Sequence, residues 1–361
     1  MRLHKTLAFV AAALSFSVAT IGCTSPSTAP TAQQSPQESL ILIDADSHGY
    51  ITYDTDSEVL TGYAKDGAEK WRENRFFPTD VHCTLTCPNA AISATVDTNP
   101  SQHKTRVIWK GNGRTRTQAF PNKSMIVHWG KDEENWVATS ESSLLWSTAG
   151  KIHAKKFQEG LADSFGSIAD DEKTLIISIQ ENTSRTWAAF RFTLDSGQLA
   201  PAEISESLPG SIGCLSPHRR TMVTLGENSA EFSLTTGEKI RDLAEFSSDC
   251  ASSSESTIVG AFSAGSGEAT QEISMFPASP SLPPAKVTVN SSGEIGIFRD
   301  CGVLLSDGKL ASLSAEGKKT ETEFDARSML TAPDGRIYSI SSSGKVGQHT
   351  ISAKGQACRI G

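Results

Sequence analysis

The chain has 361 residues, of which 33 are Lys or Arg, 41 are Asp or Glu, 37% are hydrophobic and 28 are glycine. This length suffices for one or two well-packed cores, and the polar composition excludes a protein with many membrane spans. The formal net charge is −8 and no block of basic residues is present. Nucleic acid is therefore excluded as an expected partner, because an acidic surface repels phosphate.

The first 22 residues have the three-part organisation of a secretory leader. Arg2 and Lys5 precede an apolar stretch over residues 6–21, and a small residue stands immediately before Cys23. The apolar stretch is too short and too rich in Ala and Ser for a transmembrane span. The sequence therefore predicts a signal peptide over residues 1–22 and export of the rest of the chain.

The end of this leader, Thr20-Ile21-Gly22-Cys23, resembles the signal of bacterial lipoproteins. In that family the cysteine is diacylated on its sulfur and becomes the first residue after cleavage. The resemblance implies lipidation of Cys23, although Thr20 departs from the usual leucine. It also implies a protein attached to the cell membrane through acyl chains, on the extracytoplasmic side. An ordinary cleaved leader with a structural Cys23 is the alternative.

A polar segment follows the leader. Residues 24–37 contain no aromatic side chain and no aliphatic side chain larger than alanine. Such a segment cannot bury enough surface to offset the ordering of its backbone. We therefore expect residues 23–38 to form a disordered Ser/Thr/Pro tether, which would span roughly 3 Å per residue. Because loss of the leader makes the protein still more acidic, acyl chains rather than charge attraction would anchor it.

Residues 39–361 show the pattern of short strands, and no stretch of ten or more residues has helical apolar spacing. An apolar strand, a glycine turn and a polar strand that closes on an apolar residue recur along the chain. In one copy Leu144-Leu145-Trp146 precedes Gly150, and Phe157 follows seven residues later. The turn glycines of the copies are Gly67, Gly113, Gly150, Gly197, Gly237, Gly317 and Gly355.

These glycines are about forty residues apart except between Gly237 and Gly317, where the Pro-rich segment 277–284 can hold a further turn. A four-stranded unit at this period is typical of a propeller blade, because each sheet of a closed ring covers its neighbours. Residues 39–361 are therefore predicted to be all-β, a β-propeller of eight four-stranded blades, with seven blades as the alternative. Two tandem β-sandwiches are the rival architecture, but they would need no constant period.

The segment Gly62–Trp71 (GYAKDGAEKW) resembles the tryptophan-docking repeat of PQQ-like propellers, and the other units are as similar to WD40-like repeats. The resemblance covers the whole domain as a period and a strand pattern, and it implies a fold rather than an activity. Quinone-dependent dehydrogenases of this group hold their cofactor beside a disulfide of adjacent cysteines. This sequence has no Cys-Cys pair, so no cofactor is expected.

Six cysteines remain when Cys23 carries the lipid, and an even number in an exported chain favours disulfides. Cys214 and Cys250 fall in corresponding first strands of adjacent units, which makes them the favoured pair. Cys83 with Cys87 could close a small loop, although four residues along a straight strand would hold them about 13 Å apart and beyond bonding reach. The third pair, which remains by subtraction, is Cys301 with Cys358.

Three motifs resemble chemical sites but depart from the pattern that each site requires. Cys83 and Cys87 lack the redox C-x2-C spacing, and with His82 they are a weak metal motif, so no metal site is predicted. Residues 44–52 begin like a calcium loop but lack two of its ligands, which favours a strand, a turn and a strand. Residues 261–265 resemble a nucleophile elbow without its first glycine or its helix, which favours a hairpin turn.

All six tryptophans lie between Trp71 and Trp187, and most of them fit packing between blades. Trp129 and Trp136 fit the repeat positions less well. They are therefore the candidates for a binding surface, because exposed aromatic side chains form binding hot spots and sugar platforms. Packing between blades is the alternative for both.

The function expected from these features is non-enzymatic: an acyl-anchored extracytoplasmic propeller that acts as a scaffold and binds a protein of the cell envelope through its loops. The alternative is a hydrolase, or a binder of a glycan or small ligand, that works in the central funnel. His82 or His128 clustered with acids such as Asp170 and Asp249 at a funnel mouth would favour the alternative, whereas an aromatic patch on the rim would favour docking. The sequence assigns no catalytic residue.

Overall fold

A computed structural model describes the part of the chain that follows the tether. The described residues are 39–361, apart from 75–77, 79, 84–85, 97–103, 112–113, 121–124, 130–134, 149, 159, 169–173, 182–186, 194–195, 197, 202–207, 217–218, 264–269, 291–293 and 355–356. Within these ranges the regular structure consists of β-strands, as predicted. None of the described residues belongs to a helix that is long and apolar enough to cross a membrane.

The first four sheets each contain four consecutive antiparallel strands. Their strands are β1 (Leu40–Ala45), β2 (Gly49–Asp54), β3 (Val59–Ala64), β4 (Glu69–Asn74), β5 (Asp80–Cys83), β6 (Ala90–Val96), β7 (Lys104–Gly111), β8 (Arg114–Phe120), β9 (Met125–Trp129), β10 (Trp136–Ser140), β11 (Ser143–Thr148), β12 (Lys151–Lys156), β13 (Leu161–Ile168), β14 (Thr174–Glu181), β15 (Ala188–Thr193) and β16 (Gln198–Pro201).

One three-stranded sheet, β17 to β19, and three further four-stranded sheets complete the described part of the chain. Their strands are β17 (Ser211–Ser216), β18 (Thr221–Ser233), β19 (Lys239–Ser247), β20 (Asp249–Ser252), β21 (Ser256–Ser263), β22 (Thr270–Pro277), β23 (Ala285–Asn290), β24 (Ile295–Phe298), β25 (Cys301–Ser306), β26 (Lys309–Leu313), β27 (Lys319–Asp325), β28 (Ser328–Thr331), β29 (Arg336–Ile340), β30 (Val346–Lys354) and β31 (Ala357–Ile360).

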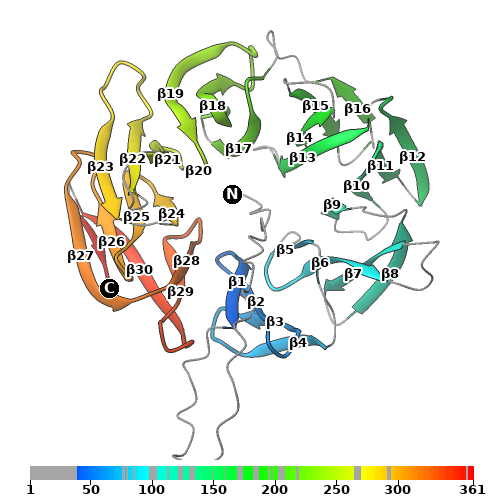
Figure 1. Cartoon of the computed structure of the whole chain (residues 1–361), viewed down its shortest axis with the longest axis horizontal. Helices are drawn as coiled ribbons and strands as arrows, with labels where there is room; N and C mark the ends of the chain where they lie inside the picture. Colours follow the sequence, from blue (N-terminus) through cyan, green and yellow to red (C-terminus); the bar gives the residue numbers. More distant parts are fainter. Residues whose placement is uncertain are drawn as a thin grey trace, which may run out of the picture.

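The sheets stand in a ring around a central axis (Figure 1). The first strand of each sheet lies nearest the centre, and the chain then moves outward strand by strand. Because the strands of each sheet alternate in direction, the fourth strand returns the chain to the end of the ring where the next inner strand begins. The connections between sheets and those between second and third strands therefore gather at this end, which we call the loop-bearing face.

The core consists of apolar side chains held between neighbouring sheets. In one cluster Ile51 and Leu60 of the first sheet pack with Ile92 and Ile108 of the second, and none of the four is more than 1% exposed. Burial of one such side chain stabilises the fold by roughly 1.5–3 kcal/mol. Each sheet therefore depends on its neighbour to cover its apolar face.

Glycines form the turns before the last strand of several sheets, as the repeat predicts. Gly67, Gly150, Gly237 and Gly317 all have positive φ angles, of 82°, 76°, 72° and 84°. A residue with a Cβ is strained in this conformation, which explains why glycine recurs at this position of the repeat. The predicted turns at positions 113, 197 and 355 lie outside the described residues.

The sheet of β17, β18 and β19 has a long second strand that turns back within its own length. Gly226 and Asn228 have φ angles of 106° and 56°. On either side of them, the N–H of Leu234 donates to the carbonyl of Arg220, with the nitrogen and oxygen 2.8 Å apart. The two halves of β18 therefore lie against each other, and a tight turn joins them on the loop-bearing face.

The first and last sheets meet at a seam that closes the ring. Tyr50 of β2 lies against Tyr338 of β29, with ring centroids 4.9 Å apart. It also stacks on Tyr63 of its own sheet. The guanidinium of Arg327 donates to the carbonyl oxygen of Leu40 at 2.5 Å. Burial, together with the neighbouring Tyr63, Tyr338 and Asp66, raises the pKa of Tyr50 to about 12, as expected for a phenol inside a packed seam.

Trp71 links the first sheet to the second. It lies opposite Gly62 in the pairing of β3 with β4, and a Cβ at Gly62 would clash with its indole. The indole N–H donates to the carbonyl oxygen of Pro88, which precedes β6, at 2.7 Å. The indole therefore docks across its own sheet onto the next, and only glycine leaves it room to do so.

The six cysteines described form the three predicted disulfides. Cys214–Cys250 joins the inner strands β17 and β20, with Cα atoms 6.0 Å apart. Cys301–Cys358 joins β25 to β31 of the last sheet, with Cα atoms 5.6 Å apart. The Cα atoms of the short-range pair Cys83–Cys87 are 5.1 Å apart because β5 ends at Cys83, so the two residues do not lie on one straight strand. These separations fall within the range that a disulfide requires.

The disulfides should differ in how much they stabilise the fold. Replacing Cys301 and Cys358 with serine removes a cross-link between residues 57 positions apart, and the chain-entropy model predicts a loss of about 4 kcal/mol. The same change at Cys83 and Cys87, four positions apart, should cost about 2 kcal/mol. Urea unfolding of both double variants measures the difference, and equal losses would contradict it.

Candidate functional site

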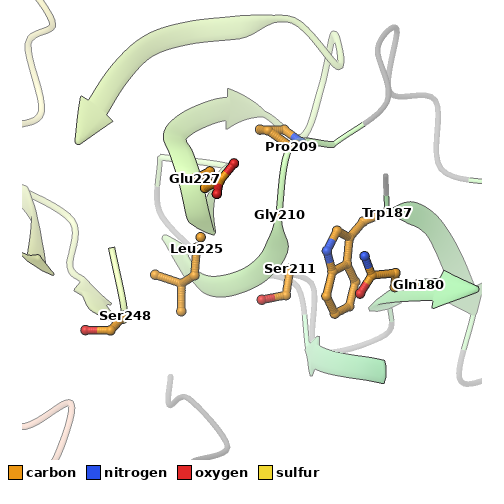
Figure 2. Close-up of a pocket in the computed structure, with 9 residues that line it drawn as sticks. Gln180, Trp187, Pro209, Gly210, Ser211, Leu225, Glu227 and Ser248 are labelled. Carbon is orange, nitrogen blue, oxygen red and sulfur yellow. The ribbon is translucent and has the colours of Figure 1, made fainter. Parts of the chain in front are cut away.

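A recess opens where the fourth and fifth sheets meet (Figure 2). Its volume is about 580 Å³. The lining residues are Gln180, Trp187, Pro209, Gly210, Ser211, Leu225, Gly226, Glu227 and Ser248. They come from the end of β14, the approach to β15, the start of β17, the turn within β18 and the connection to β20. All of these positions belong to the loop-bearing face, so we name this site the rim recess.

Backbone pairing fixes Trp187 at one side of the rim recess. Its N–H donates to the carbonyl of Leu208 at 3.2 Å and its carbonyl accepts from the N–H of Leu208 at 3.3 Å. The indole packs against the cluster that includes Leu208 and Ile212, and it remains half-buried. Trp187 therefore combines a fixed backbone with an aromatic side chain that reaches the recess (Figure 2).

Two glycines let the backbones approach closely at the rim recess. A Cβ at Gly210 would clash with the carbonyl oxygen of Leu225. Gly226, the residue after Leu225, has a φ of 106°, a backbone conformation that disfavours a larger residue. The wall between Pro209 and Glu227 is therefore made of tightly apposed main chain, which favours a rigid shape.

The polar side chains of the rim recess are the amide of Gln180, the hydroxyls of Ser211 and Ser248, and the carboxylate of Glu227. Glu227 is exposed in the turn of β18, and Ser248 is held where its N–H donates to the carbonyl of Gly260 at 2.9 Å. None of the nine lining residues is a histidine, lysine, arginine or cysteine. The set suits recognition through an aromatic face, hydrogen bonds and one negative charge.

The two tryptophans proposed for a binding surface do not form one in the described structure. Trp136 is 1% exposed and packs edge-on against Phe120, with ring centroids 4.8 Å apart. It belongs to the core between the second and third sheets, so its prediction as a surface residue is wrong. The side chain of Trp129 lies outside the described residues, as does Cys23.

The residues around the weak metal motif have structural roles. His82 is 2% exposed within β5 and does not line the rim recess. Asp44 comes close to Cys83 and Cys87, but the two sulfurs are bonded to each other and offer no thiolate to a metal. Instead, the carboxylate of Asp44 accepts the N–H of Cys83 at 2.8 Å. The side chains of His128 and Asp170 lie outside the described residues.

The other two motifs also have the expected structural form. Residues 44–52 run from the end of β1 through a turn into β2, where Asp46 accepts the N–H of His48 at 2.7 Å. Asp46 also accepts the N–H of Cys87 at 2.7 Å, which ties this hairpin to the second sheet. Strands β21 and β22 pair as antiparallel neighbours around the segment 264–269. The connection therefore joins two strands, and a nucleophile elbow would need a helix after the first.

A buried ionic network lies in the fifth sheet, beyond the rim recess. Glu231 of β18 is 1% exposed and pairs with Arg219 at 2.8 Å and with Arg241 at 2.7 Å. Thr221 donates a further hydrogen bond to the same carboxylate at 2.9 Å. Burial lowers the pKa of Arg219. The network therefore braces β18 against β19.

A second recess of about 410 Å³ lies at the seam and is lined by Lys65, Asp66, Arg336, Gln348, His349, Thr350 and Gly361. Its main ionisable groups take part in packing. Arg336 donates to the carbonyl of Ser47 at 3.4 Å. The ring of His349 lies 4.3 Å from that of Phe324, and burial lowers the pKa of His349. The side chains of this recess are therefore more engaged in packing than those of the rim recess.

The sequence did not single out Trp187 as a functional residue. Its signal is weak, because Trp187 is the last of the six tryptophans and follows a polar run immediately before a strand. The alternation along β15 places residues in or out of the core, but it does not show whether a residue before the strand packs or lines a recess. Whether such a residue packs or lines a recess depends on how closely the neighbouring sheet lies against it.

Comparison with known proteins identifies the fold. No family model and no curated protein matches the chain. Among solved structures, the computationally designed Ika8 protein is 10% identical, with 86% of this chain and 96% of that chain covered and a TM-score of 0.54. The Dos1 propeller is also 10% identical, with 83% and 85% covered and a TM-score of 0.50.

TolB from Acinetobacter baumannii is 11% identical, with 68% of this chain covered and a TM-score of 0.40. The matched part spans 63% of that TolB chain, which is less than two thirds of its length. At these identities the likeness concerns the fold alone. With the ring of antiparallel sheets and the match to the Dos1 propeller, the fold is a β-propeller.

Proposed function

We propose that this protein is an acyl-anchored, extracytoplasmic β-propeller of eight four-stranded blades that binds a protein partner in the cell envelope. The described strands form eight sheets, which supports the number of blades. Seven of these sheets have four strands. In the remaining sheet, β17 to β19, the second strand folds back on itself at Gly226. Counting the two halves of β18 separately gives this sheet four strands as well.

The secretory leader and the cysteines support the extracytoplasmic part of the proposal. All six cysteines after Cys23 are paired in three disulfides. Disulfides persist in oxidising compartments outside the cytoplasm and are rare in most cytosolic proteins. The leader and the lipoprotein-like residues before Cys23 are consistent with such a location. Acyl chains on Cys23 would hold the propeller at the membrane through the segment 24–37.

The observation that carries the docking proposal is the rim recess with Trp187 at its side. Tryptophan is enriched among the residues that contribute most to protein interfaces, especially in pockets that exclude water. The recess lies on the loop-bearing face, where the fourth and fifth sheets meet and the connection to β20 begins. A rigid scaffold that presents side chains on connecting segments is a common arrangement for binding.

The alternative, a hydrolase in the central funnel, has less support. It would need a histidine and acidic residues close together at a funnel mouth. Of the residues named for it, His82 is buried in β5, and Asp249 lies at the start of β20. The nine residues that line the rim recess include two serines and a carboxylate but no histidine to act as a base. We therefore prefer binding to catalysis.

A photo-crosslinking residue in place of the exposed Ser248 tests the docking proposal. Irradiation of intact cells should join the full-length protein to one specific protein, which mass spectrometry of the adduct identifies. The matched control carries the same residue in place of the exposed Thr320 of β27, on the outer strand of another sheet, and should not give this adduct. If both positions give the same set of adducts, or Ser248 gives none, the proposal is wrong.

Lipidation is tested by the variant Cys23→Ser. Without the sulfur that carries the acyl chains, the protein should be lost from the membrane fraction and be found in the soluble extracytoplasmic fraction or the medium. The control variant Ser27→Ala changes the tether but keeps Cys23, so it should remain attached. Membrane attachment of Cys23→Ser equal to that of the unchanged protein would contradict acylation at this position.

A further inference from the structure

The charge of the rim recess limits what its occupant can be. Glu227 is the only ionisable side chain among the nine lining residues, and it is exposed. The chain as a whole has a formal net charge of −8. An acidic protein attracts basic partners over a distance of about a Debye length, roughly 8 Å at physiological salt. A basic group is therefore the charged group that complements both the recess and the protein around it.

The aromatic side chain at the recess favours the same kind of occupant. The face of an indole attracts a cation more strongly than the rings of Tyr and Phe do. Several phenylalanine rings of the chain already have a cation over them, such as Phe276 with Arg241 at 5.3 Å and Phe298 with Arg299 at 5.5 Å. Among the described residues, no Lys or Arg lies over Trp187 in this way. Its indole is half-buried and lines the recess, where a cation from another molecule can stack on it.

The neutral groups of the recess suit a guanidinium better than an ammonium. The hydroxyls of Ser211 and Ser248 can accept hydrogen bonds. A guanidinium presents five N–H donors in one plane, and this plane can stack on an aromatic ring while its edge donates to neighbouring oxygens. An ammonium is a compact, strongly hydrated charge and cannot stack in this way. Arginine is also among the residues most enriched at interface hot spots.

The size of the recess indicates that more than one side chain enters it. A volume of about 580 Å³ lies in the range of pockets that hold ligands larger than a single side chain. Pro209, between Trp187 and Glu227, and Leu225, between Ser211 and Ser248, supply apolar surface (Figure 2). A short stretch of polypeptide around the basic residue can therefore contribute further contacts.

We infer that the rim recess binds an arginine-bearing segment of the partner protein, with the guanidinium stacked on Trp187 and its charge complemented by Glu227. This inference rests on the proposed docking function and names the chemistry of the partner. It assigns Trp187 the role of the aromatic platform and Glu227 the role of the residue that selects for positive charge. Ser211, which lies beside Trp187 in Figure 2, orients the guanidinium through a hydrogen bond.

The test compares two sets of peptides that differ in charge alone. The probes are immobilised nine-residue peptides with randomised flanks and either arginine or citrulline at the centre, since citrulline has nearly the same shape without the charge. The full-length protein in detergent should bind the best arginine peptides roughly tenfold more tightly than their citrulline counterparts. This preference should fall as the salt concentration rises.

Two substitutions link this preference to the recess. Glu227→Gln should remove most of the preference for arginine, and Trp187→Leu should weaken binding of the arginine peptides roughly tenfold while the variant stays folded by circular dichroism. The matched control is Glu245→Gln, which makes the same charge change at an exposed position of β19 that does not line the recess. This control should keep the preference.

The outcomes separate this inference from the proposed function. Equal binding of arginine and citrulline peptides, or equal effects of Glu227→Gln and Glu245→Gln, would overturn the inference. If Ser248 still gave a specific protein adduct in cells, the docking function would stand without it. An arginine preference that depends on Glu227, without any protein adduct at Ser248, would support the chemistry of the recess and contradict docking in the cell. A glycan adduct at Ser248 would overturn both.

Discussion

The structure depends on one constraint: each small sheet has two faces to cover, and only the neighbouring sheets can cover them. The clusters that pair Ile51 with Ile92, or Ile258 with Leu304, show that the core lies between sheets. A row of such sheets would leave an apolar face exposed at each end. Closure of the row removes both exposed faces, so the contact between Tyr50 and Tyr338 is as necessary as any contact inside the row.

Three further cross-links also join different sheets. The disulfides Cys214–Cys250 and Cys301–Cys358 and the bond from Trp71 to Pro88 each connect one sheet to the next. Such links oppose the separation of sheets, whereas hydrogen bonds within a sheet do not. The rim recess lies at the junction of the fourth and fifth sheets, so its shape depends on how these two sheets pack. A rigid junction lowers the entropy that a partner must lose on binding.

The repeat was readable from the sequence because backbone geometry imposes it. A turn that needs a positive φ selects glycine, so Gly67, Gly150, Gly237 and Gly317 mark the period wherever that turn occurs. The pairing of Cys214 with Cys250 followed from the same register. The site was harder to predict, because burial at a junction depends on the neighbouring sheet. Trp136 departs from the repeat positions yet is buried against Phe120, and the recess uses Trp187, which the repeat did not distinguish.

Native-state hydrogen exchange of the variant Tyr338→Ala tests the closed ring most directly. Removal of this buried ring from β29 should cost about 3–5 kcal/mol. If the first and last sheets stabilise each other across the seam, protection of the amides in β2 and in β29 should fall by similar amounts. Loss of protection confined to the sheet of β28 to β31, with β2 as well protected as before, would contradict closure at this seam.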